Sequence, residues 1–194
     1  MTQTLVTPTS ELQSIQPTAC PTILVLASGR GERFTASGGT THKLQAQLMG
    51  KAVLQHTLEA VRDSGLPWHL EDGCHPGMGD SIAVAVQKTS QSNGWLILPA
   101  DLPLIHSATL KTVAAALVGQ SVVVPVYRGQ RGHPVGFSNV CLRALLDLKG
   151  DRGAASVVHM YGAMELLLDD VGCVTDVDTV EDLAVAERLL RCKG

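Results

Sequence analysis

Phosphate-binding chemistry is indicated directly after the first apolar run of the sequence. Residues 22–27 (TILVLA) are continuously apolar, and after them come Ser28, Gly29, Arg30, Gly31, Glu32 and Arg33, with Lys43 further on. Glycines let the backbone turn sharply and point successive N–H groups at one spot, while arginine and lysine add positive charge there. The segment predicts a cradle for a triphosphate. The alternative is a tight strand-to-helix turn with solvated arginines.

A second candidate is a carboxylate just beyond another apolar run. Asp101 follows residues 95–98 (WLIL) and lies between Pro99 and Pro103, which stiffen the loop. Apolar neighbours leave the carboxylate little water, so its charge needs a partner, and a hard divalent cation is a natural one. The alternative is that Asp101 caps a turn or pairs with an arginine.

Two more carboxylates could reach the same place from the other end of the chain. Asp176 and Asp178 precede an expected helix, whose start is signalled by Thr179 and Asp182. We expect Asp178 rather than Asp176 to serve as a second metal ligand. The alternative for both is a structural role at the helix N-terminus, where the helix dipole favours negative charge.

Several better-known sites do not match the spacing of the residues. The first loop lacks the GxxxxGK[ST] pattern, and GxGxxG fails because Phe34 occupies the place of the third glycine. No second strand ends in an acidic residue about 20 positions further on, where one would hold a ribose. The histidines form no HxxxH or HxH pair, the cysteines show no CxxC spacing, and neither Ser28 nor Ser138 has a visible base.

The elements that must position these residues alternate between strands and helices. Apolar runs predict strands at residues 22–27, 67–70, 95–98, 121–127 and 164–168. Periodicity and capping residues predict helices at residues 53–64, 80–88, 107–118, 139–148, 153–161 and 179–191, with Gly65 ending the first of them. This alternation predicts a layered α/β fold with a mostly parallel sheet, whose ligands bind beyond the carboxyl ends of its strands.

The length, net charge and composition of the sequence limit the classes of function it could have. A length of 194 residues suits one domain, which we expect at residues 21–194 after a flexible leader at residues 1–20 that is rich in Thr, Gln, Pro and Ser. A net charge of −3 and a low aromatic content of 3% predict no nucleic-acid partner. No apolar run approaches the roughly 18 residues of a membrane span, and five scattered cysteines indicate reduced thiols in the cytoplasm.

Six stretches, in this order, resemble the molybdenum-cofactor nucleotidyltransferases, a MobA-like NTP transferase family, and within it the molybdopterin cytidylyltransferases. They are LASGRGERF (26–34) with Lys43, GMGDSI (77–82), LILPADLPLI (96–105), GHPVGFS (132–138), GDRGA (150–154) and DVDTVEDL (176–183). The resemblance implies a three-layer α/β/α, Rossmann-like nucleotidyltransferase domain. It also implies Mg²⁺-dependent transfer of CMP from CTP to the phosphate of molybdopterin, with release of pyrophosphate.

The resemblance also assigns roles to residues. Arg33, Lys43 and Asp101 would be catalytic, and Mg²⁺ would bind to Asp101 and Asp178. The nucleotide would contact Ala27, Ser28, Gly29, Arg30, Gly31, Gly77, Met78, Gly79 and Ser81. The acceptor would contact His133, Pro134, Gly136 and Arg152. The product would pass to a molybdenum hydroxylase or its chaperone.

Other functions remain open at this stage. One is a non-catalytic protein that binds or delivers the molybdenum cofactor, which is suggested by the short segment between Gly65 and Gly77. Another is a nucleotidyltransferase that uses a different NTP or acceptor. A small reductase is a third alternative, and the missing ribose-binding acidic residue argues against it.

Overall fold

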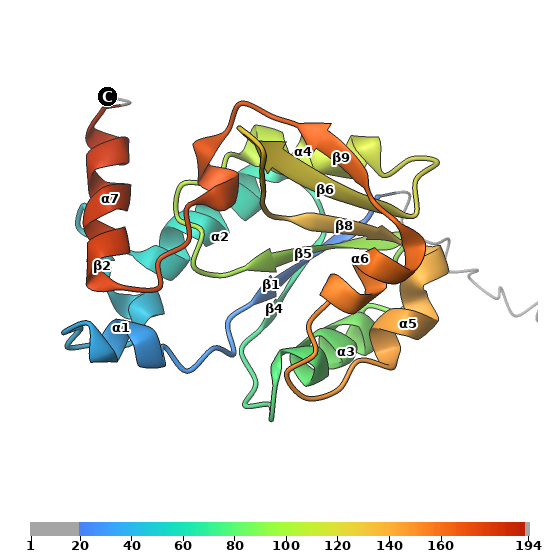
Figure 1. The fold of residues 1–194 in the computed structure, drawn as a ribbon, viewed down its shortest axis with the longest axis horizontal. Helices are drawn as coiled ribbons and strands as arrows, with labels where there is room; N and C mark the ends of the chain where they lie inside the picture. The colour runs from blue at the N-terminus through green and yellow to red at the C-terminus, as the bar shows by residue number, and fades with distance from the viewer. Residues whose placement is uncertain (1–19, 193–194) are drawn as a thin grey trace, which may run out of the picture.

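A seven-stranded sheet forms the centre of the molecule (Figure 1). The computed structural model describes residues 20–192, so the predicted leader lies outside the described residues apart from Cys20. The strand order is β4-β1-β5-β8-β6-β7, with β9 paired to β6. The strands are β1 (Thr22–Leu26), β4 (Trp68–Glu71), β5 (Gly94–Pro99), β6 (Val122–Tyr127), β7 (Gln130–Arg131), β8 (Val135–Ser138) and β9 (Met164–Leu167).

Most strands of this sheet run in one direction. β1 is parallel to both β4 and β5, and Leu26 pairs with Glu71 on one side and Pro99 on the other. β8 is antiparallel to β5 and to β6, so β6 runs in the direction of β5, and β9 is parallel to β6. The expected mostly parallel sheet is therefore confirmed, and β1, β4 and β5 end at the same edge.

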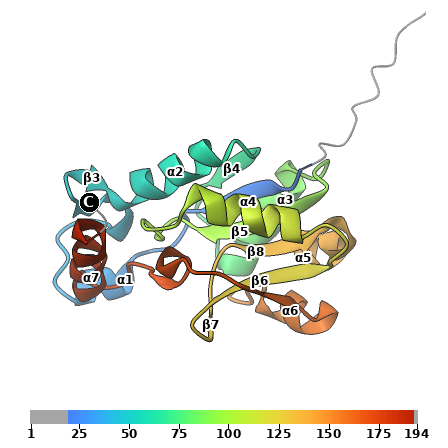
Figure 2. The same cartoon turned by 90° about the horizontal axis from the view of Figure 1, so that it is seen from above.

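Helices cover both faces of the sheet and make three layers (Figure 2). α2 and α4 lie on one face, and α3, α5 and α6 on the other. The helices are α1 (Glu32–Ala36), α2 (Val53–Ser64), α3 (Met78–Lys88), α4 (Ser107–Ala116), α5 (Leu142–Leu146), α6 (Ala155–Tyr161) and α7 (Val180–Arg191). Among the described residues, none of the helices is long and apolar enough to cross a membrane.

Two apolar clusters hold these layers together. Alternate residues of one strand point to opposite faces, so Ile23 and Val25 pack with α2 and α4, while Leu24 packs with α3 and α5. A strand that is buried on both sides must be apolar throughout, which is why residues 22–27 read as a continuous apolar run.

α1 and α7 lie beyond the carboxyl ends of the parallel strands (Figure 1). The backbone N–H of Val180, at the start of α7, donates a hydrogen bond to the hydroxyl of Ser37, which ends α1 (3.0 Å). A small hairpin of β2 (Gln47–Leu48) and β3 (Lys51–Ala52) follows the segment that carries Lys43. These elements bring the first and last parts of the described chain together at that edge.

The predicted helix boundaries are right in some places and wrong in others. α2 spans the predicted residues and ends at Gly65, and Thr179 and Asp182 form the predicted capping box of α7. α3, however, begins at Met78 with Gly77 as its N-cap. Asp80 is not the cap, because its carboxylate accepts a hydrogen bond from the backbone N–H of Gly150 (2.8 Å).

Apart from short 3-10 turns, five helices and strands were not expected from the sequence: α1, β2 and β3 of the hairpin, β7 and β8. β8 is the most consequential omission, because it enters the sheet between β5 and β6. Its sequence, VGFS, is short and contains a glycine, so its apolar pattern is weak. Gly136 of β8 lies next to Leu96 and Val113, which indicates a packing role.

Candidate active site

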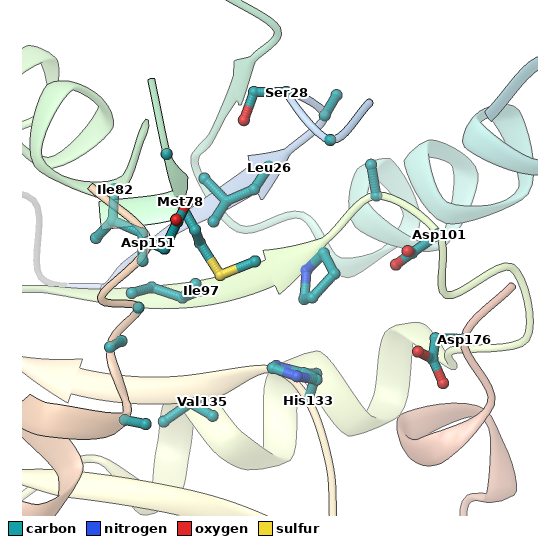
Figure 3. A pocket seen from close by; sticks show the side chains of 18 of the residues that line it. Leu26, Ser28, Met78, Ile82, Ile97, Asp101, His133, Val135, Asp151 and Asp176 are labelled. Carbon is teal, nitrogen blue, oxygen red and sulfur yellow. The ribbon is translucent and has the colours of Figure 1, made fainter. Parts of the chain in front are cut away.

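The loops after β1, β4 and β5 open onto one cavity of about 1330 Å³ at the carboxyl edge of the sheet. It is lined by most of the predicted residues: Ala27, Ser28, Gly29, Arg30, Gly31, Arg33, Lys43, Gly77, Met78, Asp101, His133 and Asp178. Figure 3 shows Asp101 and Asp176 toward one end, and Leu26, Met78, Ile82 and Ile97 toward the other. The structure thus gathers stretches that are far apart in the sequence around one space.

Five predicted residues do not line this cavity: Gly79, Ser81, Pro134, Gly136 and Arg152. Ser81 is buried behind the wall, where its hydroxyl lies 2.6 Å from that of Ser28. Gly79 donates its backbone N–H to the carbonyl of Gly150 (2.8 Å). Arg152 is exposed, whereas its neighbour Asp151 lines the cavity.

The charged centre of the cavity is a network of two cations and two carboxylates. The Lys43 ammonium donates to Asp101 Oδ2 (2.5 Å) and to Asp178 Oδ1 (2.6 Å). Arg33 reaches the other oxygen of Asp178 (2.6 Å between Nη1 and Oδ2). Burial alone would lower the pKa of Lys43, but Asp101 and Asp178 outweigh it and raise that pKa above its usual value. Lys43 therefore stays charged.

One oxygen of this network has no partner. Asp101 is only 9% exposed, and no group in the described part of the chain hydrogen-bonds to its buried Oδ1. Leaving such an atom unpaired costs about 1–3 kcal/mol, so it points to a missing partner. Both oxygens of Asp178, by contrast, already accept from cations.

The carboxylates of this network fit Mg²⁺ on the condition that the substrate supplies further ligands. Mg²⁺ is commonly held by one or two carboxylates, with substrate phosphates and water completing its shell. Within residues 20–192, no group of three or more Asp, Glu, His and Cys side chains is arranged to hold a metal ion. Among the residues that the structure describes, Asp101 Oδ1 is the one buried carboxylate oxygen without a hydrogen bond, so a metal held there would need further ligands from the substrate. The predicted role of Asp178 as a ligand stays a prediction.

Asp176 adds a further carboxylate near the network. Burial raises the pKa of Asp176 above its usual value, and the nearby negative charges of Asp101, Asp178 and Asp182 raise it further. Asp101, Asp176 and Asp178 thus lie around the same cavity, as the sequence predicted for this edge of the sheet. Additional positive charge from a ligand would stabilise them together.

The glycine turn is fastened to the segment that carries Lys43. Gly31 has φ +67°, a left-handed conformation that favours glycine, and it precedes α1. The carbonyl of Gly29 accepts a hydrogen bond from His42 Nε2 (2.9 Å). Because His42 is next to Lys43, this bond holds the backbone at Lys43 beside the turn, while Asp101 and Asp178 hold the ammonium.

His133 lies on the opposite wall, just before β8 (Figure 3). Its Nδ1 is buried and has no hydrogen-bond partner among residues 20–192. Burial lowers the pKa of His133, although Asp101, a backbone hydrogen bond to Ile97 and Asp176 partly offset that effect. The ring is therefore neutral at neutral pH and suits orientation of a ligand better than charge neutralisation.

Sequence reasoning missed part of the lining. His75, Arg131, Asp151 and His159 all face the cavity. His75 has no metal-ligand spacing with another histidine, and its neighbour Cys74 is too close in sequence to face it as a catalytic partner. Only Asp151 had a local signal, because it lies within the GDRGA stretch.

Comparison with known proteins decides the family. The model of the MobA-like NTP transferase domain matches residues 59–166, which is more than half of the chain. The chain belongs to the MobA-like NTP transferase family. It is accordingly a nucleotidyltransferase of that type. The matched part contains Asp101 and the segment around His133, while the glycine turn, Lys43 and Asp178 lie outside it.

The chain is also similar to individual proteins. Purine catabolism protein PucB from Bacillus subtilis is 30% identical over 127 residues, which cover 63% of this chain and 62% of that protein. Among solved structures, Rv0371c from Mycobacterium tuberculosis H37Rv has a TM-score of 0.73 and 24% identity over 87% of this chain and 98% of its own. Molybdopterin-guanine dinucleotide biosynthesis protein A from Archaeoglobus fulgidus has a TM-score of 0.64 and 15% identity over 88% and 99% of the two chains. These two structures share the fold.

Proposed function

We propose that this family member transfers CMP from CTP to the terminal phosphate of molybdopterin and releases pyrophosphate. The observation that carries the proposal is the buried, unpartnered Oδ1 of Asp101, a residue that lines the same cavity as the charged Lys43 and the glycine turn. This combination provides for two anionic reactants at one place. The molybdopterin-related name of the Archaeoglobus fulgidus protein with the same fold favours a pterin acceptor.

The triphosphate would bind where positive charge and backbone N–H groups meet. The turn at Gly29–Gly31 would contact the phosphates, and Lys43 and Arg33 would neutralise their charge. Asp101 would hold Mg²⁺, which when bound supplies positive charge to the phosphate oxygens. Asp178, held by both cations, would keep Lys43 and Arg33 in place.

The reaction needs positioning more than acid–base chemistry. An oxygen of the acceptor phosphate forms a bond to the α-phosphorus of CTP, and the bond from that phosphorus to the oxygen bridging to the β-phosphorus breaks. Pyrophosphate leaves with that electron pair. The acceptor phosphate is already ionised at neutral pH, so no strong base is required. His133 would orient the acceptor through its unpartnered Nδ1.

The acceptor would occupy the part of the cavity between β8 and α6. That part is lined by His133, Val135, Gly153, Ala154, Val158 and His159. Small and apolar side chains there leave room for a flat ring system. On this proposal the protein works in the cytoplasm and passes its product to a molybdenum hydroxylase or to that enzyme's chaperone.

The test is product formation with each of CTP, GTP, ATP and UTP, in the presence of molybdopterin and Mg²⁺. We expect pyrophosphate release with CTP, dependence on the acceptor, and loss of activity when EDTA removes the metal. Release with a different NTP would correct the choice of nucleotide. No release with any NTP, combined with tight binding of molybdopterin, would overturn the proposal in favour of a delivery role.

A further inference from the structure

A buried carboxylate at the edge of the sheet is unused by the proposed reaction. Glu71 ends strand β4 and is only 1% exposed. Lys88 Nζ (2.8 Å) and His69 Nε2 (3.1 Å) contact its Oε2, and His75 Nε2 (3.0 Å) contacts its Oε1. The backbone N–H of Gly73 donates to Oε1 as well (3.3 Å). Glu71 therefore fixes the positions of the side chains that contact it, those of His69, His75 and Lys88.

The charge of Glu71 is well stabilised. Burial alone would raise the pKa of Glu71, but the hydrogen bonds from Lys88, His75, His69 and the Gly73 backbone lower that pKa to about 2. The side chain is therefore an ionised carboxylate, which only accepts hydrogen bonds. Each contacting histidine nitrogen must carry a proton.

Of the two histidines, only His75 lines the cavity. β4 lies beside β1, with Glu71 level with Leu26, so the loop after Glu71 leaves the sheet next to the glycine turn. This loop carries His75 to the cavity wall formed with Ser28, Pro76 and Met78. The floor at this end is apolar, with Leu26, Ile82 and Ile97 (Figure 3), and suits the flat face of a base.

The bond to Glu71 fixes the hydrogen-bonding character of His75. Whenever the ring carries a single proton, the bond to Glu71 places that proton on Nε2, so Nδ1 holds a lone pair. Within the described part of the chain, no group hydrogen-bonds to this Nδ1, and the side chain keeps 16% of its exposure. At the cavity wall His75 thus offers a hydrogen-bond acceptor.

We propose that His75 is a specificity-determining residue that accepts a hydrogen bond from the exocyclic amino group of cytosine, and that Glu71 is the positioning residue that orients it. The inference rests on the proposed function, because a nucleotide must bind with its triphosphate at the adjoining glycine turn. An amino group donates to Nδ1, whereas the 4-oxo group of uracil cannot, and it would leave two acceptors facing each other.

The test compares calorimetric binding of CTP and UTP, each with Mg²⁺. We expect wild-type protein to bind CTP at least about tenfold more tightly than UTP, since an unpaired polar contact costs roughly that factor. In His75→Phe the ratio should fall close to one, mainly through weaker CTP binding. Glu71→Gln should also reduce the ratio, and it carries the test if His75→Phe does not fold.

His69→Ala is the matched control, because His69 contacts the same carboxylate but does not line the cavity. The ratio of its affinities for CTP and UTP should stay at the wild-type value. If the cluster had only a structural role, His69→Ala and His75→Phe should change this ratio alike. A wild-type ratio near one, a preference for UTP, or a ratio unchanged in His75→Phe overturns the inference. If pyrophosphate release from CTP persists in that case, the proposed function stands alone, whereas absence of any nucleotide binding overturns both.

Discussion

At the scale of single residues, the three aspartates at the carboxyl edge differ in ways that the sequence does not reveal. The expectation from the sequence was that Asp101 binds Mg²⁺ and that Asp178 supports it as a second ligand. In the structure Asp178 is fully paired with Lys43 and Arg33, while Asp101 keeps one buried oxygen bare. Whether a carboxylate oxygen already has a hydrogen-bond partner depends on side chains from distant parts of the chain. The spacing of residues in the sequence therefore could not distinguish Asp101 from Asp178.

The ionised state of Glu71 makes a prediction about acid stability. Its pKa is about 2 in the folded protein, against an ordinary value of 4.5. Between these values the unfolded chain binds more protons, so this group's stabilisation is present above about pH 4.5 and is lost as the pH falls toward 2. Urea unfolding across this range should show wild-type stability falling more steeply than that of Glu71→Gln. Parallel curves for the two proteins would contradict the assignment.

At the scale of elements, the start of α3 and the loop at 149–153 behave as one wall. A Cβ on Gly77 would overlap the backbone carbonyl of Gly150, and Gly79 and Asp80 both hydrogen-bond to Gly150. This contact joins the predicted nucleotide side of the cavity to the predicted acceptor side. It also explains why α3 begins at Met78 rather than at an Asp80 cap.

The close approach of Gly77 to the carbonyl of Gly150 predicts that a methyl group at position 77 destabilises the protein. Gly77→Ala should lower the unfolding free energy by roughly 1–3 kcal/mol, because the backbone at Gly150 has to move. Asp80→Asn keeps an oxygen that can accept from Gly150 and should cost less, about 1 kcal/mol. Chemical denaturation of both variants measures this difference. Equal stability of Gly77→Ala and wild-type protein would rule out the contact.

At the scale of the whole molecule, the sequence predicts the layers and the site edge but not every strand. Buried parallel strands are apolar throughout, so β1 and β5 were recognisable, and capping residues marked α7. β8 was missed because its residues were read only as a binding motif, although Phe137 is fully buried in the core. The cavity needs β8, since this strand brings His133 opposite Asp101.

The most direct test of the account is pyrophosphate release by Asp101→Asn with CTP, molybdopterin and Mg²⁺. Loss of one preorganised charge interaction at a phosphoryl centre typically lowers the rate by about 100-fold or more. We therefore predict a drop of at least about that size. The urea unfolding midpoint should fall only moderately, because the amide keeps the shape of the side chain and Lys43 keeps its ion pair with Asp178. A variant that folds normally and retains wild-type activity would contradict the central role of Asp101.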